Sequence, residues 1–547
     1  MDTRLSAATQ ADARAAARSR LKFVPMDLPV PSTPPTMQVH PGRVKPSYGQ
    51  ILRSSAIVGG ASVVGIALGI VRTKILALLL GPSGVGLIGL YTSIFDLVRS
   101  IAGMGISRSG VRQIAESVGS ENTQQIGRTV VTLRRVALIL GLAGAAALFA
   151  LCGPVTQMTF GNRRNSGSVA LLSVAVLFAA VSSGQTALVQ GMRRIGDLAR
   201  LSVLGALFGT IFSIPIVYVF GERGIALFLV AVAAAGNLSS WWYARKIKLE
   251  TVSLTWHEVA EEASGLLKLG FAFMASGLMS LGAAYLVRVF ILRQIGADAA
   301  GFYQAAWMLS GLYVGTILQA MGTDFFPRLT AVANDDGACN RLVNEQTEIG
   351  LLIAAPGILA TLTLAPLVIH VFYSASFEPA IDLLRWHCLG MFLRVASFPM
   401  GYIILARGQR GLFLMTETLS NLVYVALIWG GVSYFGLVGT GMAFFGMYLF
   451  CWLLVFCVVK RVSRFAWSPP SIRLGVFLTP LVGIVFVTGR VLPPQASLAI
   501  GLIITLGASY YSLKTVASLF PADRLPSTLR RLLTWMRMGP TEGPPER

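Results

Sequence analysis

Long apolar runs alternate with short polar breaks along almost the whole chain. A hydrocarbon layer of roughly 30 Å is crossed by about 20 apolar residues of α-helix, and runs of this length recur throughout. The strict alternation of apolar and polar positions that membrane-spanning strands need is missing from the sequence. The pattern predicts about 14 transmembrane helices, with centres near Gly65, Ile94, Leu142, Leu177, Leu207, Val232, Met279, Tyr313, Ile358, Leu393, Val425, Phe444, Val482 and Ile503.

The composition points to the same class of protein. The chain has 547 residues, of which 54% are hydrophobic and only 13% charged, and its mean hydropathy is +0.68. These values exclude an ordinary soluble globular domain. The polar breaks are short, so no water-soluble domain is inserted between the spans. We therefore expect an all-α polytopic membrane protein.

The net charge of +21 is distributed unevenly over the predicted loops. If the N-terminus is cytoplasmic, most loop cations fall on the cytoplasmic side. The opposite loops then hold only Arg163, Arg164, Arg223, Arg293 and Arg490. Cytoplasmic loops of membrane proteins are enriched in Lys and Arg. The distribution predicts that both termini are cytoplasmic, and it argues against a nucleic-acid partner.

A short pattern occurs twice along the chain. Gly81 and Gly86 follow one apolar run, and Gly296 and Gly301 follow another at an offset of 215 residues, which is about six spans. Parallel repeats of this kind build one class of transporters. The expected parts are a disordered basic tail (1–50), an N-lobe of six spans (51–244), a cytoplasmic linker (245–268), a C-lobe of six spans (269–461), two further spans (473–518) and a C-terminal tail (519–547).

The sequence contains no pattern typical of a catalytic or metal centre. The five cysteines form no paired framework, and the four histidines lack metal-ligand spacing. We expect no catalytic residues, no metal, no cofactor and no enzymatic activity.

Several charged residues fall inside predicted spans. The cations are Arg72, Lys74, Arg99, Arg288, Arg385 and Arg394, and the acids include Asp96 and Glu417. A cation at the centre of a spanning helix costs about 2.5 to 3.5 kcal/mol on insertion scales, so such residues face a partner or a wet cavity. We interpret Arg72, Lys74, Arg99, Arg288 and Arg394 as candidates for binding an anionic substrate, and Asp96 and Glu417 as candidates for coupling to an ion.

Structural interpretations of the same residues stay open. Asp96 and Arg99 are three positions apart and suit an ion pair on one helix face. Snorkelling to the membrane surface suits Lys74 and Arg385. No acid lies three or four positions from Arg72, Arg288 or Arg394. Arg72 and Arg288 stand at similar places before the repeated glycines, which favours a wet cavity between the lobes.

Two stretches resemble a known family. "VRTKILALLLGPSGVGLIGLYTSIFDLV" (71–98) and "GTDFFPRLTAVAND" (322–335) are similar to flippases of the O-antigen and enterobacterial-common-antigen type. These are polysaccharide transporters of the multidrug/oligosaccharidyl-lipid/polysaccharide exporter superfamily. The resemblance covers residues 47 to about 464. It implies a multi-pass protein that transfers an undecaprenyl-pyrophosphate-linked oligosaccharide from the cytoplasmic to the periplasmic leaflet of the bacterial inner membrane. It also implies work alongside a polymerase and a chain-length regulator of lipopolysaccharide or exopolysaccharide assembly.

Other functions are weighed by the charges they require. A multidrug or cation exporter of the same superfamily needs an acidic cavity, whereas the intramembrane charges here are mainly basic. A murein-precursor flippase has similar electrostatics, and only the family-like stretches separate it. A membrane glycosyltransferase or ligase normally needs a sizeable catalytic loop outside the membrane.

Overall fold

The computed structural model describes residues 48–519 except 121, 248, 250 and 251. The expected tails were 1–50 and 519–547, of which 1–47 and 520–547 lie outside the described residues. Residues 48–50 and 519 already belong to helices α2 and α16. The helices are α2 (Tyr48–Gly103), α3 (Ile106–Gly119), α4 (Thr123–Ala150), α5 (Cys152–Phe160), α6 (Ser166–Gly191), α7 (Ile195–Phe220), η1 (Gly221–Arg223), α8 (Gly224–Ala244), α9 (Trp256–Gln294), α10 (Ala297–Ala331), α11 (Asp336–Thr363), α12 (Ala365–Phe372), η2 (Ala375–Phe377), α13 (Ala380–Ala406), α14 (Arg410–Ser463), α15 (Pro469–Val491) and α16 (Pro494–Leu519). Over this part of the chain the fold is all-α, as predicted.

Nine helices among the described residues are long and apolar enough to cross a membrane. Three of them, of 44, 50 and 54 residues, are long enough to cross twice, and each bends at a glycine with positive φ: Gly81, Gly221 or Gly436. α9 and α10 are not among the nine, although they have 39 and 35 residues. The protein is therefore a multi-pass membrane protein, and the count of fourteen spans stays a prediction.

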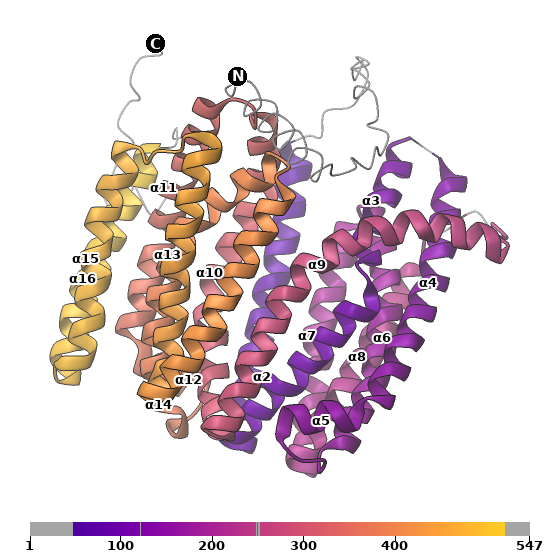
Figure 1. Ribbon diagram of the computed structural model, residues 1–547, viewed down its shortest axis with the longest axis horizontal. Helices are drawn as coiled ribbons and strands as arrows, with labels where there is room; N and C mark the ends of the chain where they lie inside the picture. Colours follow the sequence, from indigo (N-terminus) through magenta and orange to yellow (C-terminus); the bar gives the residue numbers. More distant parts are fainter. Residues whose placement is uncertain (1–47, 121, 248, 250–251, 520–547) are drawn as a thin grey trace, which may run out of the picture. The chain divides into compact units, whose positions relative to one another are not determined.

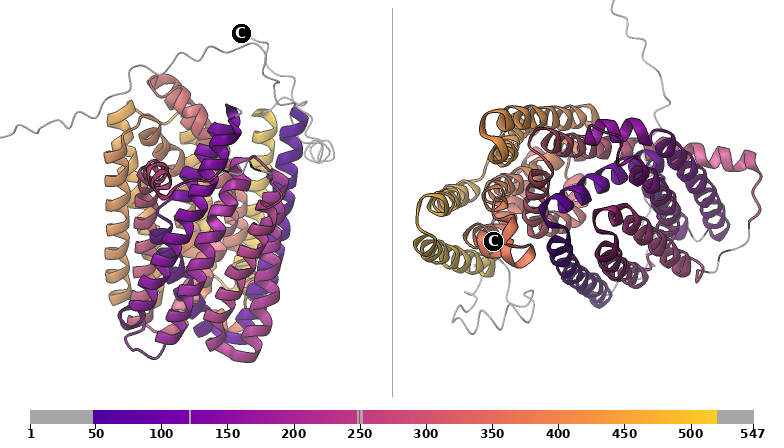
Figure 2. Two further views of the ribbon diagram at one scale, coloured as in Figure 1. Left: turned by 90° about the vertical axis from the view of Figure 1, so that its right-hand side faces the viewer. Right: turned by 90° about the horizontal axis from the view of Figure 1, so that it is seen from below.

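The helices form two groups that repeat one architecture. α4 and α11 both have 28 residues, begin 213 positions apart at Thr123 and Asp336, and are each followed after one residue by a short helix, α5 or α12. The bends at Gly221 and Gly436 are 215 positions apart, as are the positive-φ glycines Gly81 and Gly296. We call α2–α8 the N-lobe and α9–α14 the C-lobe (Figure 1). Seen along the helices, the lobes lie on opposite sides, with α15 and α16 at the far edge of the C-lobe (Figure 2).

The lobes meet through glycines at the end of the bundle that carries α5 and α12, which we call the turn end; the opposite end, which carries α3, is the linker end (Figure 1). A Cβ added to Gly301 would lie 1.9 Å from the backbone oxygen of Pro82, and one added to Gly86 would lie 2.5 Å from that of Ala297. The repeated glycines therefore let the two lobes touch backbone to backbone.

The first helix of each lobe also packs into the core of the other lobe. Ala77 and Val85 of α2 belong to the buried cluster that α10, α11 and α13 build. Tyr285 and Val289 of α9 belong to a buried cluster of N-lobe residues. The exchange is reciprocal, so separating the lobes would expose apolar surface on both.

α15 is attached to the C-lobe through polar contacts with one face of α11. The amide oxygen Oδ1 of Asn344 accepts from the backbone N–H of Ser468 at 2.8 Å. Oε1 of Glu348 accepts from the hydroxyls of Ser468 at 2.8 Å and Ser471 at 2.6 Å. The Ser468 hydroxyl also caps the first turn of α15. These contacts join α15 to the C-lobe.

The segment predicted as a linker, 245–268, is partly helical. Its second half is helical, since α9 begins at Trp256 behind a capping box formed by Thr255 and Glu258. Hydrogen bonds from the backbone and hydroxyl of Thr255, with Arg128 nearby, lower the pKa of the Glu258 carboxyl. The sequence does not signal this helix by hydropathy, because residues 256–268 include several charged side chains and the apolar run of the following span begins after them.

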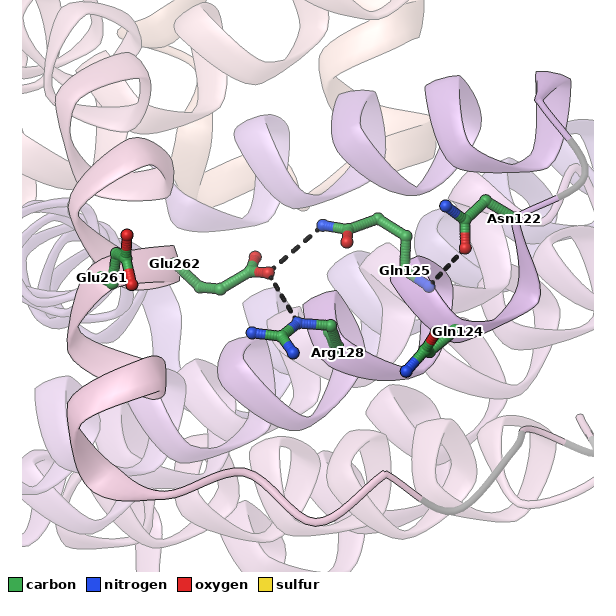
Figure 3. A pocket seen from close by; sticks show the side chains of 6 residues that line it. All are labelled: Asn122, Gln124, Gln125, Arg128, Glu261 and Glu262. Carbon is green, nitrogen blue, oxygen red and sulfur yellow. Dashed lines mark hydrogen bonds and ion pairs between the residues drawn. The ribbon is translucent and has the colours of Figure 1, made fainter.

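The first turns of α9 lie against α4 of the N-lobe. Arg128 of α4 contacts Oε1 of Glu262 at 3.2 Å and Oε1 of Glu258 at 3.6 Å. Gln125 donates to the same Glu262 oxygen at 3.2 Å, beside an open polar cavity of about 440 Å³ (Figure 3). Farther along, Gly270 of α9 touches Gly105, where an added Cβ would lie 2.1 Å from a backbone oxygen. The linker end of α9 is thus held by the N-lobe.

Replacing Arg128 by alanine should loosen this segment. The contact with Glu258 and the partly buried ion pair with Glu262 are lost. The Glu262 pair contributes up to about 1 kcal/mol, so backbone hydrogen exchange over 256–268 should accelerate by up to about five-fold. Exchange followed by mass spectrometry measures this. Arg112→Ala is the matched control, because Arg112 pairs within α3, with Glu116 at 2.7 Å. Equal exchange rates in both variants would contradict the conclusion that Arg128 holds the first turns of α9.

Candidate functional site

Two cavities lie on either side of α9 and share Leu281 in their walls. The N-lobe cavity, of about 520 Å³, is lined by α2, α3, α6 and α9. The C-lobe cavity, of about 500 Å³, is lined by α9, α10, α13 and α14. Both hold charged side chains at positions that the sequence places within or beside apolar spans. They form the candidate site of this protein.

The N-lobe cavity contains two of the predicted site residues. Asp96 and Arg99 line it together with Arg108, Ser107 and Ser183. Nη2 of Arg99 lies 3.7 Å from Oδ1 of Asp96, so the ion pair suggested by their spacing is present. The Arg99 side chain stays 51% exposed. Two arginines against one carboxylate leave this cavity with a net positive charge.

The C-lobe cavity contains Arg394 and Glu417. The guanidinium of Arg394 lies 5.7 Å from the centre of the Tyr448 ring, and its Nη1 is 3.9 Å from the sulfur of Met391. Glu417 lies near enough to interact electrostatically with it. Within the described part of the chain, neither side chain has an ion-pair partner within 4 Å. Arg394 therefore keeps hydrogen-bonding capacity for a ligand.

A polar stripe on α14 completes the C-lobe cavity. Glu417, Ser420, Asn421 and Tyr424 all line it, and their spacing of three and four residues puts them on one helix face. Of these four residues, only Glu417 was predicted from the sequence. The other three could have been found from the helical spacing of polar positions within an apolar run.

Arg288 lies behind these cavities rather than in their lining. Its side chain is buried, at 7% exposure, and its Nε donates to Oε1 of Gln304 at 2.9 Å. Its guanidinium also lies 5.5 Å from the Trp307 ring centre, and Trp307 lines the C-lobe cavity. Asp96 is within electrostatic range. Arg288 is thus stabilised by a neutral amide, Gln304, and an aromatic ring, Trp307. Both lie on α10, so the sequence of α9 alone does not identify them.

Arg72 lines a third cavity, of about 390 Å³, between α2, α7 and α10. We call it the side cavity. A Cβ added to Gly209 of α7 would lie 2.5 Å from Nη1 of Arg72, so the guanidinium packs against that glycine. The exposed side chain of Met308 lies in the same wall. Among the described residues that line this cavity, Arg72 alone is charged.

The remaining intramembrane cations are engaged by protein groups. Nζ of Lys74 donates to the backbone oxygens of His370, at 2.6 Å, and Tyr373. Nη1 of Arg385 lies 3.3 Å from Oδ1 of Asp382. The structure therefore separates Lys74 and Arg385 from the three cavities, while Arg72, Arg99 and Arg394 line them.

Residues 75–382, more than half of the chain, match the model of a family described as polysaccharide biosynthesis protein. The lipid III flippase of Escherichia coli is 23% identical over 404 residues, which cover 73% of this chain and 95% of the relative.

Solved structures of transporters share the fold. The lipid II flippase MurJ in an inward closed conformation superposes with a TM-score of 0.62 at 13% identity, covering 85% of this chain and 99% of that one. An inward-facing multidrug resistance transporter of the MATE family, in the MOP superfamily, gives a TM-score of 0.61 at 15% identity, covering 73% and 96%. The chain belongs to the polysaccharide biosynthesis protein family and has the fold of the MOP superfamily transporters.

Proposed function

We propose that this protein is a flippase that moves an undecaprenyl-pyrophosphate-linked oligosaccharide from the cytoplasmic to the periplasmic leaflet of the bacterial inner membrane. The family match and the relative named as a lipid III flippase support a lipid-linked precursor as the substrate. The relatives are named as flippases and transporters, which also supports a transport function over an enzymatic one.

The observation that carries the proposal is the excess of arginine in the two cavities beside α9. Arg99, Arg108 and Arg394 line them, against Asp96 and Glu417, and Asp96 is already paired. A pyrophosphate is a compact anion, and guanidinium groups bind phosphate oxygens through paired, charge-assisted hydrogen bonds. In this proposal Arg99 and Arg394 hold the phosphates from the two lobes, and Arg288 keeps the local potential positive from behind the cavity wall.

The lipid chain does not need to enter the polar cavities. The side cavity combines Arg72 with an apolar wall that includes Met308 and Leu312, both exposed. Such a crevice would allow the isoprenoid chain of the substrate to stay in hydrocarbon while cations hold its head group. We assign Arg72 to a phosphate contact on this route.

The membrane potential favours outward movement of the anion. An inside-negative potential contributes roughly 2.3 kcal/mol per charge per 100 mV, whereas the same field opposes return of the empty cationic site. A coupling ion offsets that opposition. Glu417, which has no ion pair within 4 Å among the described residues, is the first candidate carrier of a proton, and Asp96 is the second.

Orientation and pathway complete the proposal. The excess of loop cations on one side supports cytoplasmic termini, which puts the turn end in the periplasm. A polymerase and a chain-length regulator of O-antigen or exopolysaccharide assembly are the proposed partners. A multidrug or cation exporter is the main alternative, and the basic cavities disfavour it. A murein-precursor flippase would have the same electrostatics.

A deletion strain tests the proposal. We expect lipid-linked repeat units to accumulate in the cytoplasmic leaflet and surface polysaccharide to disappear, while peptidoglycan synthesis continues. Both effects should be reversed by the wild-type gene on a plasmid, but not by the Arg72→Ala or Arg288→Ala variant. Changed drug sensitivity with intact surface polysaccharide would instead support the exporter. A block in peptidoglycan synthesis would support the murein-precursor flippase.

A further inference from the structure

Two cations join the lobes at the turn end, and each donates from the first helix of one lobe to the end of a short helix of the other. Lys74 of α2 donates to the backbone oxygens of His370, at 2.6 Å, and Tyr373, at the end of α12. Arg293 of α9 donates through Nη2 to the backbone oxygen of Gln157, near the end of α5. α2 and α5 belong to the N-lobe, and α9 and α12 to the C-lobe.

The accepting carbonyls occupy equivalent places in the repeat. α5 and α12 follow helices of equal length that begin 213 positions apart, and Gln157 and His370 are separated by the same 213 positions. The donors are not equivalent. At the repeat offset of 215, Lys74 corresponds to Val289 and Arg293 corresponds to Leu78, so neither cation is repeated in the other lobe. The two cations stand four positions apart in the repeat, which is about one helical turn. The same contact therefore arises from two different sequence positions.

Physical chemistry explains why a cation suits these places. The last carbonyls of a helix carry the negative end of its dipole and lack the N–H of a further helical turn. The Gln157 oxygen also accepts from the backbone N–H of Gly161 at 3.0 Å, so Arg293 is its second donor. A lysine or arginine from a neighbouring element satisfies them with a charge-assisted hydrogen bond. On the α5 side a second contact adds to the first, because the hydroxyls of Thr159 and Tyr285 lie 2.7 Å apart and are buried.

We propose that these two contacts are paired latches that hold the turn end closed, and that both must open before the lobes can separate there. They accompany the backbone contact between Gly301 and Pro82, which closes the same end. The lining of the N-lobe cavity, by contrast, includes Gly105, Ser107 and Arg108 near the linker end. The inference deepens the proposed function, because a gate at this end matters only for a carrier with alternating access.

Labelling of a single cysteine in the C-lobe cavity tests the latches. Cys451 lines that cavity and is half-buried, so a variant that keeps only this cysteine, with serine at 152 and 457 and alanine at the buried positions 339 and 388, reports access. A membrane-impermeant maleimide is added to sealed vesicles whose turn end faces the medium. The orientation is checked with Arg164→Cys, in an exposed loop beside α5.

The labelling rate follows the population that is open at the turn end. Lys74→Ala and Arg293→Ala should each raise it about five-fold, and the double variant about thirty-fold, because each removes a partly exposed charged hydrogen bond. Lys74→Arg and Arg293→Lys keep the donors and should stay near the parent rate. Arg164→Ala removes the same charge at the same end without a latch contact and should leave the rate unchanged.

Parent-like labelling of the double variant, at normal protein amount and thermal stability, would overturn the proposal. If an alanine variant is lost from the membrane, Lys74→Met and Arg293→Met keep the aliphatic stem and answer the same question. The reaction needs no transported lipid, so a wrong substrate assignment leaves the outcome unaffected. Conversely, intact latches with no defect in polysaccharide after gene deletion would reject only the proposed substrate.

Discussion

Replacing Arg394 by alanine is expected to abolish surface polysaccharide while the protein remains in the membrane at its normal amount. Arg394 lines the C-lobe cavity beside Met391, the Tyr448 ring and Glu417, and among the described residues it has no ion-pair partner within 4 Å. A charged hydrogen bond to phosphate contributes about 1.5 to 3 kcal/mol, so transport should fall roughly 10- to 150-fold. Polysaccharide on gels and a flux assay in vesicles measure the loss.

The conservative variant separates charge from geometry at this position. Arg394→Lys keeps the positive charge but cannot bind two phosphate oxygens with one planar group, so it should retain part of the activity. Arg410→Ala, an exposed arginine at the start of α14, is the matched control and should transport normally. Normal polysaccharide in the Arg394→Ala strain would remove the C-lobe cavity from the proposed phosphate route.

Replacing Gly301 by alanine is expected to destabilise the contact between the lobes. The new Cβ would lie 1.9 Å from the backbone oxygen of Pro82, and backbone cannot move aside as a flexible side chain can. Inserting a methyl group into a packed interface costs about 1 to 3 kcal/mol. The variant should therefore have a lower thermal midpoint in detergent and raised access to Cys451 from the turn end.

The same helix supplies the control for this substitution. A Cβ at Gly311 of α10 would meet nothing within 4 Å, and alanine is the better helix former by about 1 kcal/mol. Gly311→Ala should leave the thermal midpoint unchanged or slightly higher. If both alanine variants behaved alike, the close approach of α10 to Pro82 would not contribute to stability.

The class of fold follows directly from the order of residues. In hydrocarbon every backbone N–H and C=O needs a protein partner, so only helices and closed barrels can span it. Continuous apolar runs of about 20 residues, without the alternation of barrel strands, therefore form helices. The repeat could also be found from the sequence, because Gly81 and Gly296 both have a positive φ, which favours glycine at these two positions. The helix in the second half of the linker was harder to predict from the sequence, because the first turns of α9 are polar and are held by Arg128 of α4.

The roles of individual charges depended on the rotation and contacts of helices. Arg72 and Lys74 are two positions apart, which turns their side chains by about 200° on a helix. One therefore packs beside Gly209 in the side cavity, and the other reaches α12. In the same way Arg288 finds Gln304, which is 16 positions away across a turn between two helices.

Hydropathy and glycine spacing along the chain thus suffice for membrane-spanning helices arranged in two similar lobes, because both depend on backbone chemistry that each segment carries itself. Which cation faces a cavity, which is buried with an amide and which caps a helix of the other lobe depends on contacts between residues far apart in the chain. Only the packing of the helices specifies those contacts.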